Sequence, residues 1–180
     1  KKVLLIDGDI RKRTISHKYG KNVGLTGFLI DDGSSVAIDD IIIPNAVDTN
    51  VDFIPAGMLP PNPTELLMAD RLDELVRNAS ERYDYIIIDT TPMFSVADAG
   101  IISRVAEVTL YVIRVGVQDK AFLADLERMY QNNHFNNLCI VLNDVDVSNP
   151  RYSCSYGYGY GYSNSSGGRR RRNPFGRLKG

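Results

Sequence analysis

Two acidic stretches directly follow apolar runs, and their residue types suit phosphate and metal chemistry. Asp7 and Asp9 come after the apolar residues 3–6, and Asp89 comes after the apolar residues 85–88. If both runs are parallel strands, the acids meet at one edge of a sheet, where ligands bind in α/β proteins. Carboxylates at that edge can hold a hydrated Mg²⁺ against the phosphates of a nucleotide. Each Asp alone could be a turn former, but two such strand ends together favour a phosphate and metal site.

The strands that would position these acids are predicted by short runs rich in Ile and Val. Continuous apolar runs without alternation are typical of strands that are buried on both faces of a parallel sheet. Such runs occupy residues 3–6, 85–88, 109–113 and 139–142, and a weaker fifth strand is expected over residues 52–54.

Helical segments are expected between these runs. Asn62, Pro63 and Glu65 predict an N-cap, a first-turn proline and a capping box for a helix that continues to about Arg82. Further helices are expected over residues 96–105 and 119–132. The alternation of strands and helices predicts an α/β fold, with a mostly parallel sheet flanked by helices and joined by right-handed crossovers.

The composition is that of one globular domain. The 180 residues are 43% hydrophobic and 24% charged, and no apolar run reaches the roughly 18 residues that a membrane span needs. Two cysteines are too few for a disulfide framework, so a reducing compartment is expected. His17 and His134 have no partner at ligand spacing, and no zinc site is expected. Asp84 and Asp98 are expected to be surface or capping residues.

Charge is divided unevenly along the chain. Residues 151–180 hold seven basic residues and no acid, whereas the first 150 residues hold 14 basic and 22 acidic residues, so the tail is +7 and the body −8. From Arg151 onward no hydrophobic periodicity continues, and glycines alternate with tyrosines, which predicts flexibility. We therefore expect a folded core at residues 1–150 and a flexible Tyr/Gly/Arg-rich tail at residues 151–180.

The glycine-rich phosphate-binding loop that usually accompanies such acids has no counterpart in the chain. No G-x-x-x-x-G-K-[ST] sequence occurs, and the pair Gly20 and Lys21 is followed by Asn22. In a P-loop protein this Walker A loop and its strand usually come before a strand such as residues 3–6. The 180 residues are therefore expected to be a piece of a longer polypeptide.

Several segments in order resemble the bacterial tyrosine kinases of the capsular and exopolysaccharide biosynthesis type. VLLIDGDIR at residues 3–11 is similar to their Walker A′ motif, and YIIIDTTP at residues 85–92 is similar to their Walker B motif. IPAG at residues 54–57, followed by PPNPTELL at residues 60–67, is the most specific match, and the turn at residues 24–26 also resembles the family. The resemblance implies a P-loop NTPase-like fold of the deviant Walker type, which uses ATP and Mg²⁺.

The resemblance also implies roles for the matching site residues. Asp7 would be the catalytic base that takes the proton from a tyrosine hydroxyl, and Asp9 and Asp89 would hold Mg²⁺, directly or through water. Arg11 would organise the phosphate side or a subunit contact, and a structural salt bridge is an equally good interpretation. Asn143, after the last strand, resembles an Asn that contacts adenine in the wider ATPase group, and a turn-forming Asn is the alternative.

Members of this family phosphorylate a tyrosine cluster at their own C-terminus, generally in a neighbouring subunit of a ring-like homo-oligomer. By resemblance, the expected partners are other copies of the chain, a membrane-anchored polysaccharide chain-length or export protein that could be fused upstream, and a protein-tyrosine phosphatase. The expected location is the cytoplasmic face of the cell membrane. The phosphate acceptors would be the tail tyrosines Tyr152, Tyr156, Tyr158, Tyr160 and Tyr162.

Other functions remain open. A partition-type ATPase of the deviant Walker group would share the three aspartates, but it gives no reason for the tail tyrosines or for residues 60–67. A catalytically incomplete phosphoacceptor or scaffold would explain the missing Walker A loop, without which these residues alone are expected to be inactive. Four adjacent arginines at residues 169–172 are weak support for a nucleic-acid or membrane arm, and no nucleic-acid partner is expected.

Overall fold

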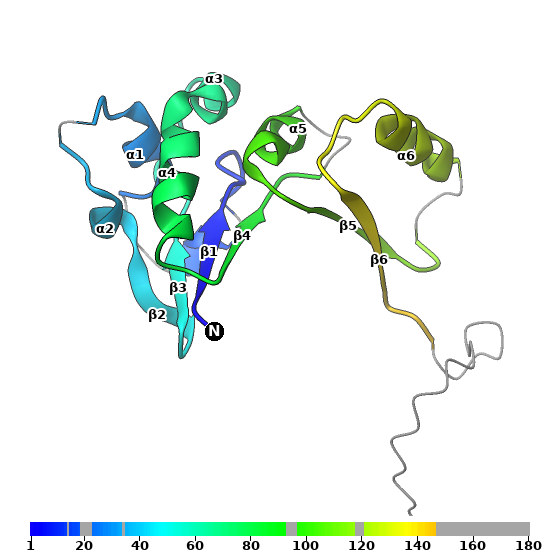
Figure 1. Cartoon of the computed structure of the whole chain (residues 1–180), viewed down its shortest axis with the longest axis horizontal. Helices are drawn as coiled ribbons and strands as arrows, with labels where there is room; N and C mark the ends of the chain where they lie inside the picture. The colour runs from blue at the N-terminus through cyan, green and yellow to red at the C-terminus, as the bar shows by residue number, and fades with distance from the viewer. Residues whose placement is uncertain (14, 19–22, 34, 93–96, 118–120, 147–180) are drawn as a thin grey trace, which may run out of the picture. The chain divides into compact units, whose positions relative to one another are not determined.

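The structure is a computed structural model that describes residues 1–13, 15–18, 23–33, 35–92, 97–117 and 121–146 (Figure 1). The chain divides into two units, residues 1–144 and residues 145–180. The tail tyrosines and the arginine run lie outside the described residues, so the flexible tail stays a prediction.

The five strands that the apolar runs predict are present to within one residue at each end. A further strand, β2, was not expected because its sequence, IPNAVD, has no apolar run. The six strands are β1 Val3–Asp7, β2 Ile43–Asp48, β3 Val51–Ile54, β4 Tyr85–Asp89, β5 Thr109–Arg114 and β6 Leu138–Asn143.

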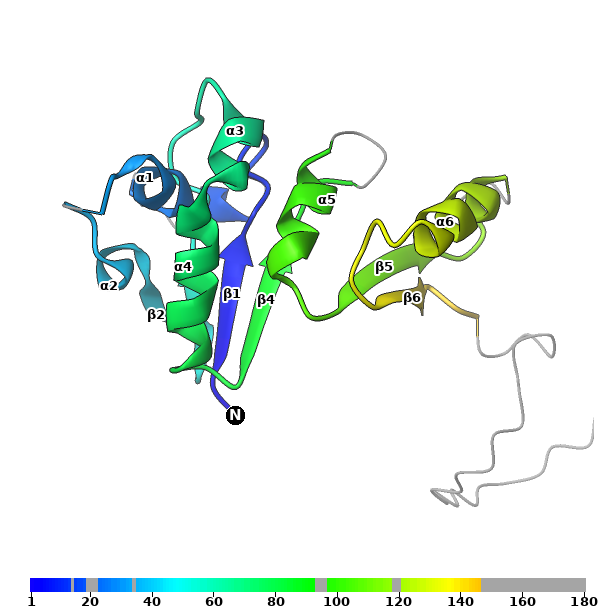
Figure 2. The same cartoon turned by 45° about the horizontal axis from the view of Figure 1, so that its top comes forward.

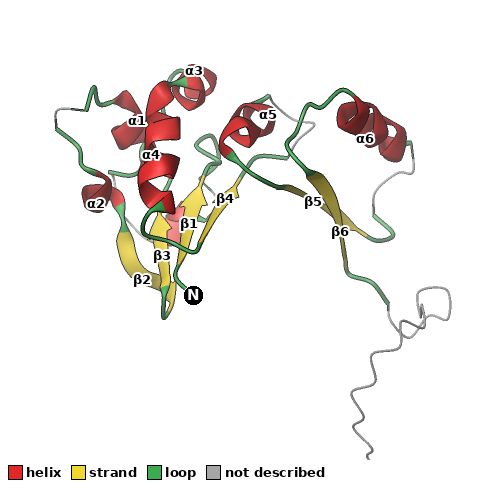
Figure 3. Cartoon of the chain, in the orientation of Figure 1, coloured by secondary structure: helices red, strands yellow, loops and turns green. Residues whose placement is uncertain are grey.

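The strands form two sheets, coloured yellow in Figure 3. The first has the order β2-β3-β1-β4, in which β1 pairs in parallel with both β3 and β4, and β2 is an antiparallel edge strand. The second sheet consists of β5 and β6 in parallel. The expected mostly parallel arrangement is therefore present, but as two sheets among the described residues rather than one.

Helices alternate with the strands, and two expected helices are shorter than predicted. Residues 96–105 contain a short helix followed by a 3₁₀ turn, and residues 119–132 contain a helix from residue 122 to residue 131. The helices are α1 Leu25–Ile30, α2 Ile38–Ile41, α3 Pro63–Met68, α4 Asp70–Ser80, α5 Asp98–Ile102 and α6 Phe122–Gln131, with 3₁₀ turns η1 Ser16–Lys18 and η2 Ser103–Val105.

The prediction of one helix from Asn62 to about Arg82 is wrong, because the helix is broken at Ala69. Ala69 has extended backbone angles, φ −65° and ψ 145°, which separate α3 from α4. Arg104, distant in sequence, donates to the carbonyl oxygens of Leu67 at 2.7 Å and Ala69 at 3.1 Å, so it satisfies two of the carbonyl groups that the break leaves without helical partners. The capping box is also wrong, because Asn62 Nδ2 donates to the Glu65 side chain at 2.8 Å and no cap bond to the backbone forms.

One face of the four-stranded sheet packs under α1, α3, α4 and α5 (Figures 1 and 3). The expectation that the strands are buried on both faces holds for β3, holds only in part for β1, and is wrong for β4, β5 and β6. Tyr85 and Ile87 of β4 are 58% and 53% exposed, because within the described residues the helices cover only the opposite face of that strand. The core residues include Leu4, Ile6, Phe28, Ile54, Leu67, Leu72 and Leu75.

A buried polar network fixes the start of the four-stranded sheet. Asp52 is 5% exposed, and its carboxylate accepts hydrogen bonds from Tyr83 Oη at 2.7 Å and Asn45 N at 2.9 Å, while Lys2 Nζ lies at 3.5 Å. Desolvation acts to raise the pKa of Asp52, but these hydrogen bonds and the Lys2 charge outweigh it and lower that pKa. Burial and the hydrogen bond to Asp52 raise the pKa of Tyr83 to about 12.

The Asp52 network predicts a specific loss of stability in acid. A lowered pKa in the folded state adds stability above the unfolded-state value of about 3.9, and this contribution is lost as pH falls through the folded-state pKa. We expect Asp52→Asn to cost about 2 kcal/mol at pH 7, and thermal unfolding to show the gap from wild type closing below about pH 4. Glu81→Gln, which changes an exposed carboxylate after α4, is the control. A gap that stays constant down to pH 3 would contradict the network.

Candidate functional site

The two predicted acidic strand ends lie next to each other. β1 and β4 lie side by side and run in parallel (Figure 2). Their register runs from Val3 opposite Tyr85 to Asp7 opposite Asp89. The backbone N–H of Gly8 then donates to the carbonyl oxygen of Asp89 at 2.8 Å, which joins the two chain segments just beyond the strands. The structure therefore brings Asp7, Asp9 and Asp89 to one sheet edge, as the sequence predicts.

Asp7 is completely buried and extensively hydrogen-bonded. Its Oδ2 accepts from the backbone N–H of Ser16 at 3.0 Å and also from the Ser16 hydroxyl. Its Oδ1 accepts from the backbone N–H of Asp9 at 3.3 Å. These bonds come from the turn that follows β1, so the carboxylate holds this turn against the end of its own strand.

Asp9 shapes the next part of the same turn. It is 5% exposed, and its Oδ1 accepts from the backbone N–H of Lys12 at 3.0 Å. Its carbonyl oxygen accepts from the N–H of Arg13 at 2.8 Å. The other carboxylate oxygen, Oδ2, accepts no hydrogen bond from the described residues. It can therefore act as a ligand to a cation or to a water bound to that cation.

Asp89 differs from the other two acids because it is exposed. Desolvation at the sheet edge, followed by the negative charges of Asp7 and Asp9, raises the pKa of Asp89. The three carboxylates therefore repel one another at neutral pH. A cation bound among them would remove that repulsion, which is the electrostatic property expected of an Mg²⁺ site.

The donor set fits Mg²⁺ better than a metal held wholly by protein. Within the ranges that the structure describes, no group of three or more His, Cys, Asp or Glu side chains is placed to hold a metal ion. Mg²⁺ usually keeps several waters and takes only one or two carboxylates together with substrate phosphates. Thr91, two residues after Asp89, has a buried hydroxyl with no hydrogen-bond partner, and it could serve such water. Asp9 and Asp89 therefore fit as the two carboxylates.

The repulsion among the three carboxylates predicts that replacing Asp89 by Asn raises the Tm without Mg²⁺ and ATP but reduces the increase in Tm that they give. Asp89→Asn should raise the Tm of the metal-free protein at pH 7, because a carboxylate with a raised pKa destabilises the fold once it is ionised. The same variant should show a smaller increase in Tm than the wild type when Mg²⁺ and ATP are added. Differential scanning fluorimetry with and without Mg²⁺ and ATP measures both effects, with Glu81→Gln as the control. A lower Tm for metal-free Asp89→Asn would contradict this assignment.

Arg11 is held in a salt bridge that closes the turn after β1. Its guanidinium donates to both carboxylate oxygens of Asp98, at 2.5 and 3.1 Å, and to the hydroxyl of Thr64 at 2.8 Å. The hydrogen bonds that Arg11 donates to Asp98 raise the pKa of Arg11. The expectation that Asp98 is a surface or capping residue is wrong, because it is 1% exposed and needs this partner. The geometry favours the structural salt bridge for Arg11.

Asn143 and Asp84 contact residues other than the three aspartates of the acidic edge. Asn143 ends β6 in the two-stranded sheet, opposite Arg114, and its side chain accepts from the N–H of Asp144 at 2.9 Å. This is the contact of a turn-forming Asn, so the adenine contact stays a prediction. Asp84 is exposed and pairs with Lys1 at 2.8 Å, as expected of a surface residue.

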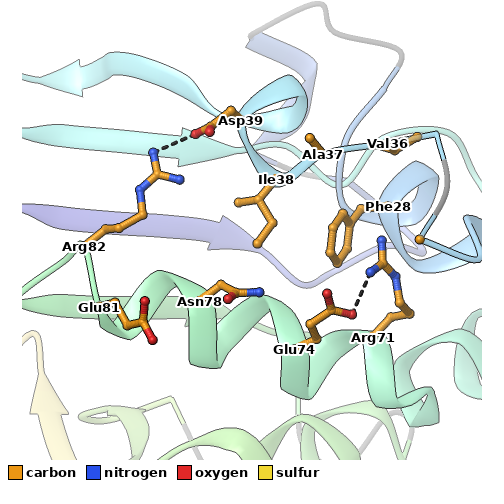
Figure 4. A pocket seen from close by; sticks show the side chains of 11 residues that line it. Phe28, Val36, Ala37, Ile38, Asp39, Arg71, Glu74, Asn78, Glu81 and Arg82 are labelled. Carbon is orange, nitrogen blue, oxygen red and sulfur yellow. Dashed lines mark hydrogen bonds and ion pairs between the residues drawn. The ribbon is translucent and has the colours of Figure 1, made fainter.

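A separate groove of about 360 Å³ lies among α1, α2 and α4 (Figure 4). Arg71 stacks over the Phe28 ring at 4.0 Å and pairs with Glu74 at 2.6 Å, and Arg82 pairs with Asp39 at 2.6 Å. Both guanidinium groups are thus neutralised by acids within the groove. The groove is lined by none of the three strand-end aspartates, and we do not assign the phosphate site to it.

Three residues of the site were not found from the sequence. Ser16, Thr64 and Asp98 contact Asp7 or Arg11 from positions 9, 53 and 87 residues away along the chain. Of the three, Asp98 had the strongest sequence signal for a site role. It is an acid in the first turn of a helix, where a carboxylate can accept two hydrogen bonds from one arginine. Ser16 and Thr64 had none, since a hydroxyl residue is common in any turn or helix start.

The structure has the α/β fold of the P-loop NTPase-like proteins. A plasmid partition protein from Borrelia burgdorferi shares the fold, with a TM-score of 0.56 and 24% identity over 78% of this chain and 65% of that one. The kinase domain of the Escherichia coli tyrosine kinase ETK is more similar, with a TM-score of 0.71 and 33% identity over 90% of this chain and 62% of that one. No protein-family model matches the chain.

Sequence similarity then gives the family. The tyrosine-protein kinase wzc of Salmonella typhimurium is 44% identical over 135 residues, which cover 73% of this chain and 18% of the relative. The chain belongs to the bacterial tyrosine kinases. It spans about a fifth of the length of that relative. Within the described residues, no helix has the length and apolar character that crossing a membrane requires.

Proposed function

We propose that this chain is the catalytic part of an ATP-dependent protein-tyrosine kinase that phosphorylates tyrosines of its own C-terminal tail. The observation that carries the proposal is the pairing of Asp7 with Asp89 at the ends of β1 and β4, in a chain 44% identical to a tyrosine-protein kinase. Phosphoryl transfer needs positioning and charge neutralisation more than covalent help, and an acidic edge of this kind can provide both.

In the proposed reaction, the oxygen of a tail tyrosine attacks the γ-phosphorus of ATP. The new O–P bond forms as the bond to the ADP oxygen breaks, and the tyrosine proton passes to Asp7. Asp9 and Asp89 would hold Mg²⁺, which neutralises charge on the phosphates when bound. A tyrosine hydroxyl with a pKa near 10 keeps its proton at neutral pH, so an acceptor is needed. Asp7 is completely buried, so the residues that cover it must move before a tyrosine reaches it.

The tail suits the role of substrate. Five tyrosines lie among glycines between residues 152 and 162, where an extended segment could enter an active site. The tail carries +7 and the first 150 residues carry −8, so the two attract each other before phosphorylation. The chain contains no G-x-x-x-x-G-K-[ST] sequence, and we expect residues 1–180 alone to transfer phosphate poorly.

The wider setting follows from the family and belongs to the same proposal. We expect self-association into a ring in which the tail of one subunit enters the site of its neighbour. A membrane-anchored polysaccharide chain-length or export protein would place the kinase at the cytoplasmic face of the membrane, and a protein-tyrosine phosphatase would reverse the reaction. Capsular or exopolysaccharide synthesis and export would be the regulated process.

The experiment that tests the function is the intact mass of the full-length protein from its source cells, with phosphosites mapped by fragmentation. A series of added phosphates confined to residues 152–162 is expected, while the exposed Tyr130 of α6 stays unmodified. Replacing the five tail tyrosines by Phe should remove the series. A tail without phosphate in every growth phase would overturn the kinase function and favour a partition-type ATPase.

A further inference from the structure

Ser16 makes an unusual set of contacts to Asp7. Its backbone N–H donates to Asp7 Oδ2 at 3.0 Å, and its hydroxyl lies in hydrogen-bond contact with the same oxygen. The hydroxyl oxygen also accepts from the backbone N–H of Ala56 at 2.7 Å. Three separate parts of the chain therefore meet at Ser16: the end of β1, the turn η1 and the segment after β3.

The direction of this chain of hydrogen bonds is fixed. The N–H of Ala56 can only donate, so the oxygen of Ser16 accepts it, and the single hydroxyl hydrogen of Ser16 is left for Asp7. Ala56 and Asp7 are both completely buried, so water does not compete for either group. The sequence of donors is thus Ala56 N–H to Ser16 Oγ–H to Asp7 Oδ2.

The two oxygens of the Asp7 carboxylate are consequently unequal. Oδ2 receives two donors from Ser16, which is the usual capacity of one carboxylate oxygen. Within the part of the chain that the structure describes, Oδ1 receives a single donor, the N–H of Asp9 at 3.3 Å, which leaves it with capacity for a second. If Asp7 accepts a proton, Oδ1 is the atom that can take it.

We infer that Ser16 is a positioning residue that holds the Asp7 carboxylate with Oδ1 directed toward the reacting hydroxyl. This inference rests on the proposed function, in which Asp7 is the proton acceptor. It also gives the segment of residues 54–57 a task, because Ala56 N–H fixes the hydroxyl of Ser16. Without that hydroxyl, Ala56 N–H loses its acceptor, and the Asp7 carboxylate is held by two backbone donors, Ser16 N–H and Asp9 N–H, instead of three donors.

The test uses Ser16→Ala, Ser16→Thr and Ser16→Val in the full-length protein, with phosphate transfer to the tail as the readout. Ser16→Ala should lower kcat about 10- to 100-fold and leave KM for ATP within about twofold of the wild type, because the Ser16 hydroxyl is engaged by Asp7 and Ala56. Ser16→Thr keeps the hydroxyl and should retain most of kcat. Thr and Val have nearly the same shape, so their ratio isolates the hydroxyl even if Ser16→Ala fails to fold.

Ser80→Ala is the matched control, because Ser80 also donates a hydrogen bond of 2.7 Å, to the carbonyl of Arg77, but lies exposed at the end of α4. It should leave kcat unchanged. Equal kcat for Ser16→Thr and Ser16→Val would overturn the inference. The inference would also be overturned if the loss of kcat in Ser16→Ala were fully explained by the fraction of unfolded protein, measured by thermal unfolding.

A double-mutant cycle separates this inference from the proposed function. If Ser16 acts through Asp7, then adding Ser16→Val to Asp7→Asn should change the remaining rate less than about twofold. An Asp7→Asn protein with the wild-type rate would overturn the proposed role of Asp7. An inactive Asp7→Asn protein combined with a fully active Ser16→Val protein would overturn only the role of Ser16.

Discussion

Replacing Asp7 by Asn should lower the rate of phosphate transfer to the tail tyrosines by about 10²- to 10⁴-fold, the usual contribution of a general base. An amide has nearly the shape of the carboxylate but does not accept the tyrosine proton. The rate is measured with purified full-length protein, ATP and Mg²⁺, by mass spectrometry of the tail at timed intervals. KM for ATP should change little, because Asp9 and Asp89 are untouched.

The stability of Asp7→Asn must be measured beside its rate. The buried carboxylate accepts three hydrogen bonds from N–H and O–H donors, and an amide N–H₂ facing such donors costs about 1–3 kcal/mol. Rates are therefore compared at a temperature where both proteins are folded. Asp84→Asn is the matched control, because Asp84 is an exposed aspartate just before β4 that pairs with Lys1.

Purified Asp7→Asn that phosphorylates its tail at the wild-type rate would contradict the role of Asp7. A different result would favour the acceptor hypothesis: phosphate on the tail of Asp7→Asn in cells, but none when the purified wild-type or variant protein is given ATP. In that case another kinase modifies this tail. The two measurements together therefore distinguish a kinase from a catalytically incomplete phosphoacceptor.

The acidic edge could be predicted from the sequence because its signals are local. Asp7 and Asp89 each directly follow a run of Ile, Leu or Val, and Asp9 comes two residues after Asp7. Parallel strands bring their carboxyl ends together at one edge of the sheet. The register of β1 and β4 places Asp7 opposite Asp89, so the two aspartates lie side by side at the edge of the sheet. The strand β2 was missed because an edge strand with polar residues lacks that local signal.

The contacts that organise the edge could not be predicted, because they depend on tertiary structure. From its neighbours Asp98 is expected to be a surface or capping residue of a helix, and only the fold places it against Arg11. The break at Ala69 is similar, since the local sequence is helical throughout and Arg104 supplies the hydrogen bonds from another element. In both cases an arginine distant in sequence outweighs the local preference.

Replacing Gly24 by Ala should destabilise the protein by about 3 kcal/mol, at the upper end for overpacking. A Cβ atom at Gly24 would lie 2.2 Å from the carbonyl oxygen of Pro55 and 2.7 Å from the backbone N of Gly57. Both neighbours are backbone, so no change of rotamer relieves the clash. The N–H groups of Leu25 and Thr26 bind this same segment, at 2.8 and 2.9 Å, and would be displaced with it.

Gly100→Ala provides the matched control for Gly24→Ala, because nothing lies within 4 Å of a Cβ at Gly100, which is inside α5. There the substitution should stabilise the helix by about 0.5–1 kcal/mol. Urea unfolding of both variants measures the difference, and Gly24→Ala with wild-type stability would contradict the close packing.

The displaced segment carries the Ala56 N–H that binds Ser16, so Gly24→Ala should also lower kcat at temperatures where it is folded. A folded Gly24→Ala protein with full kcat would show that residues 54–57 support the fold but not the orientation of Asp7.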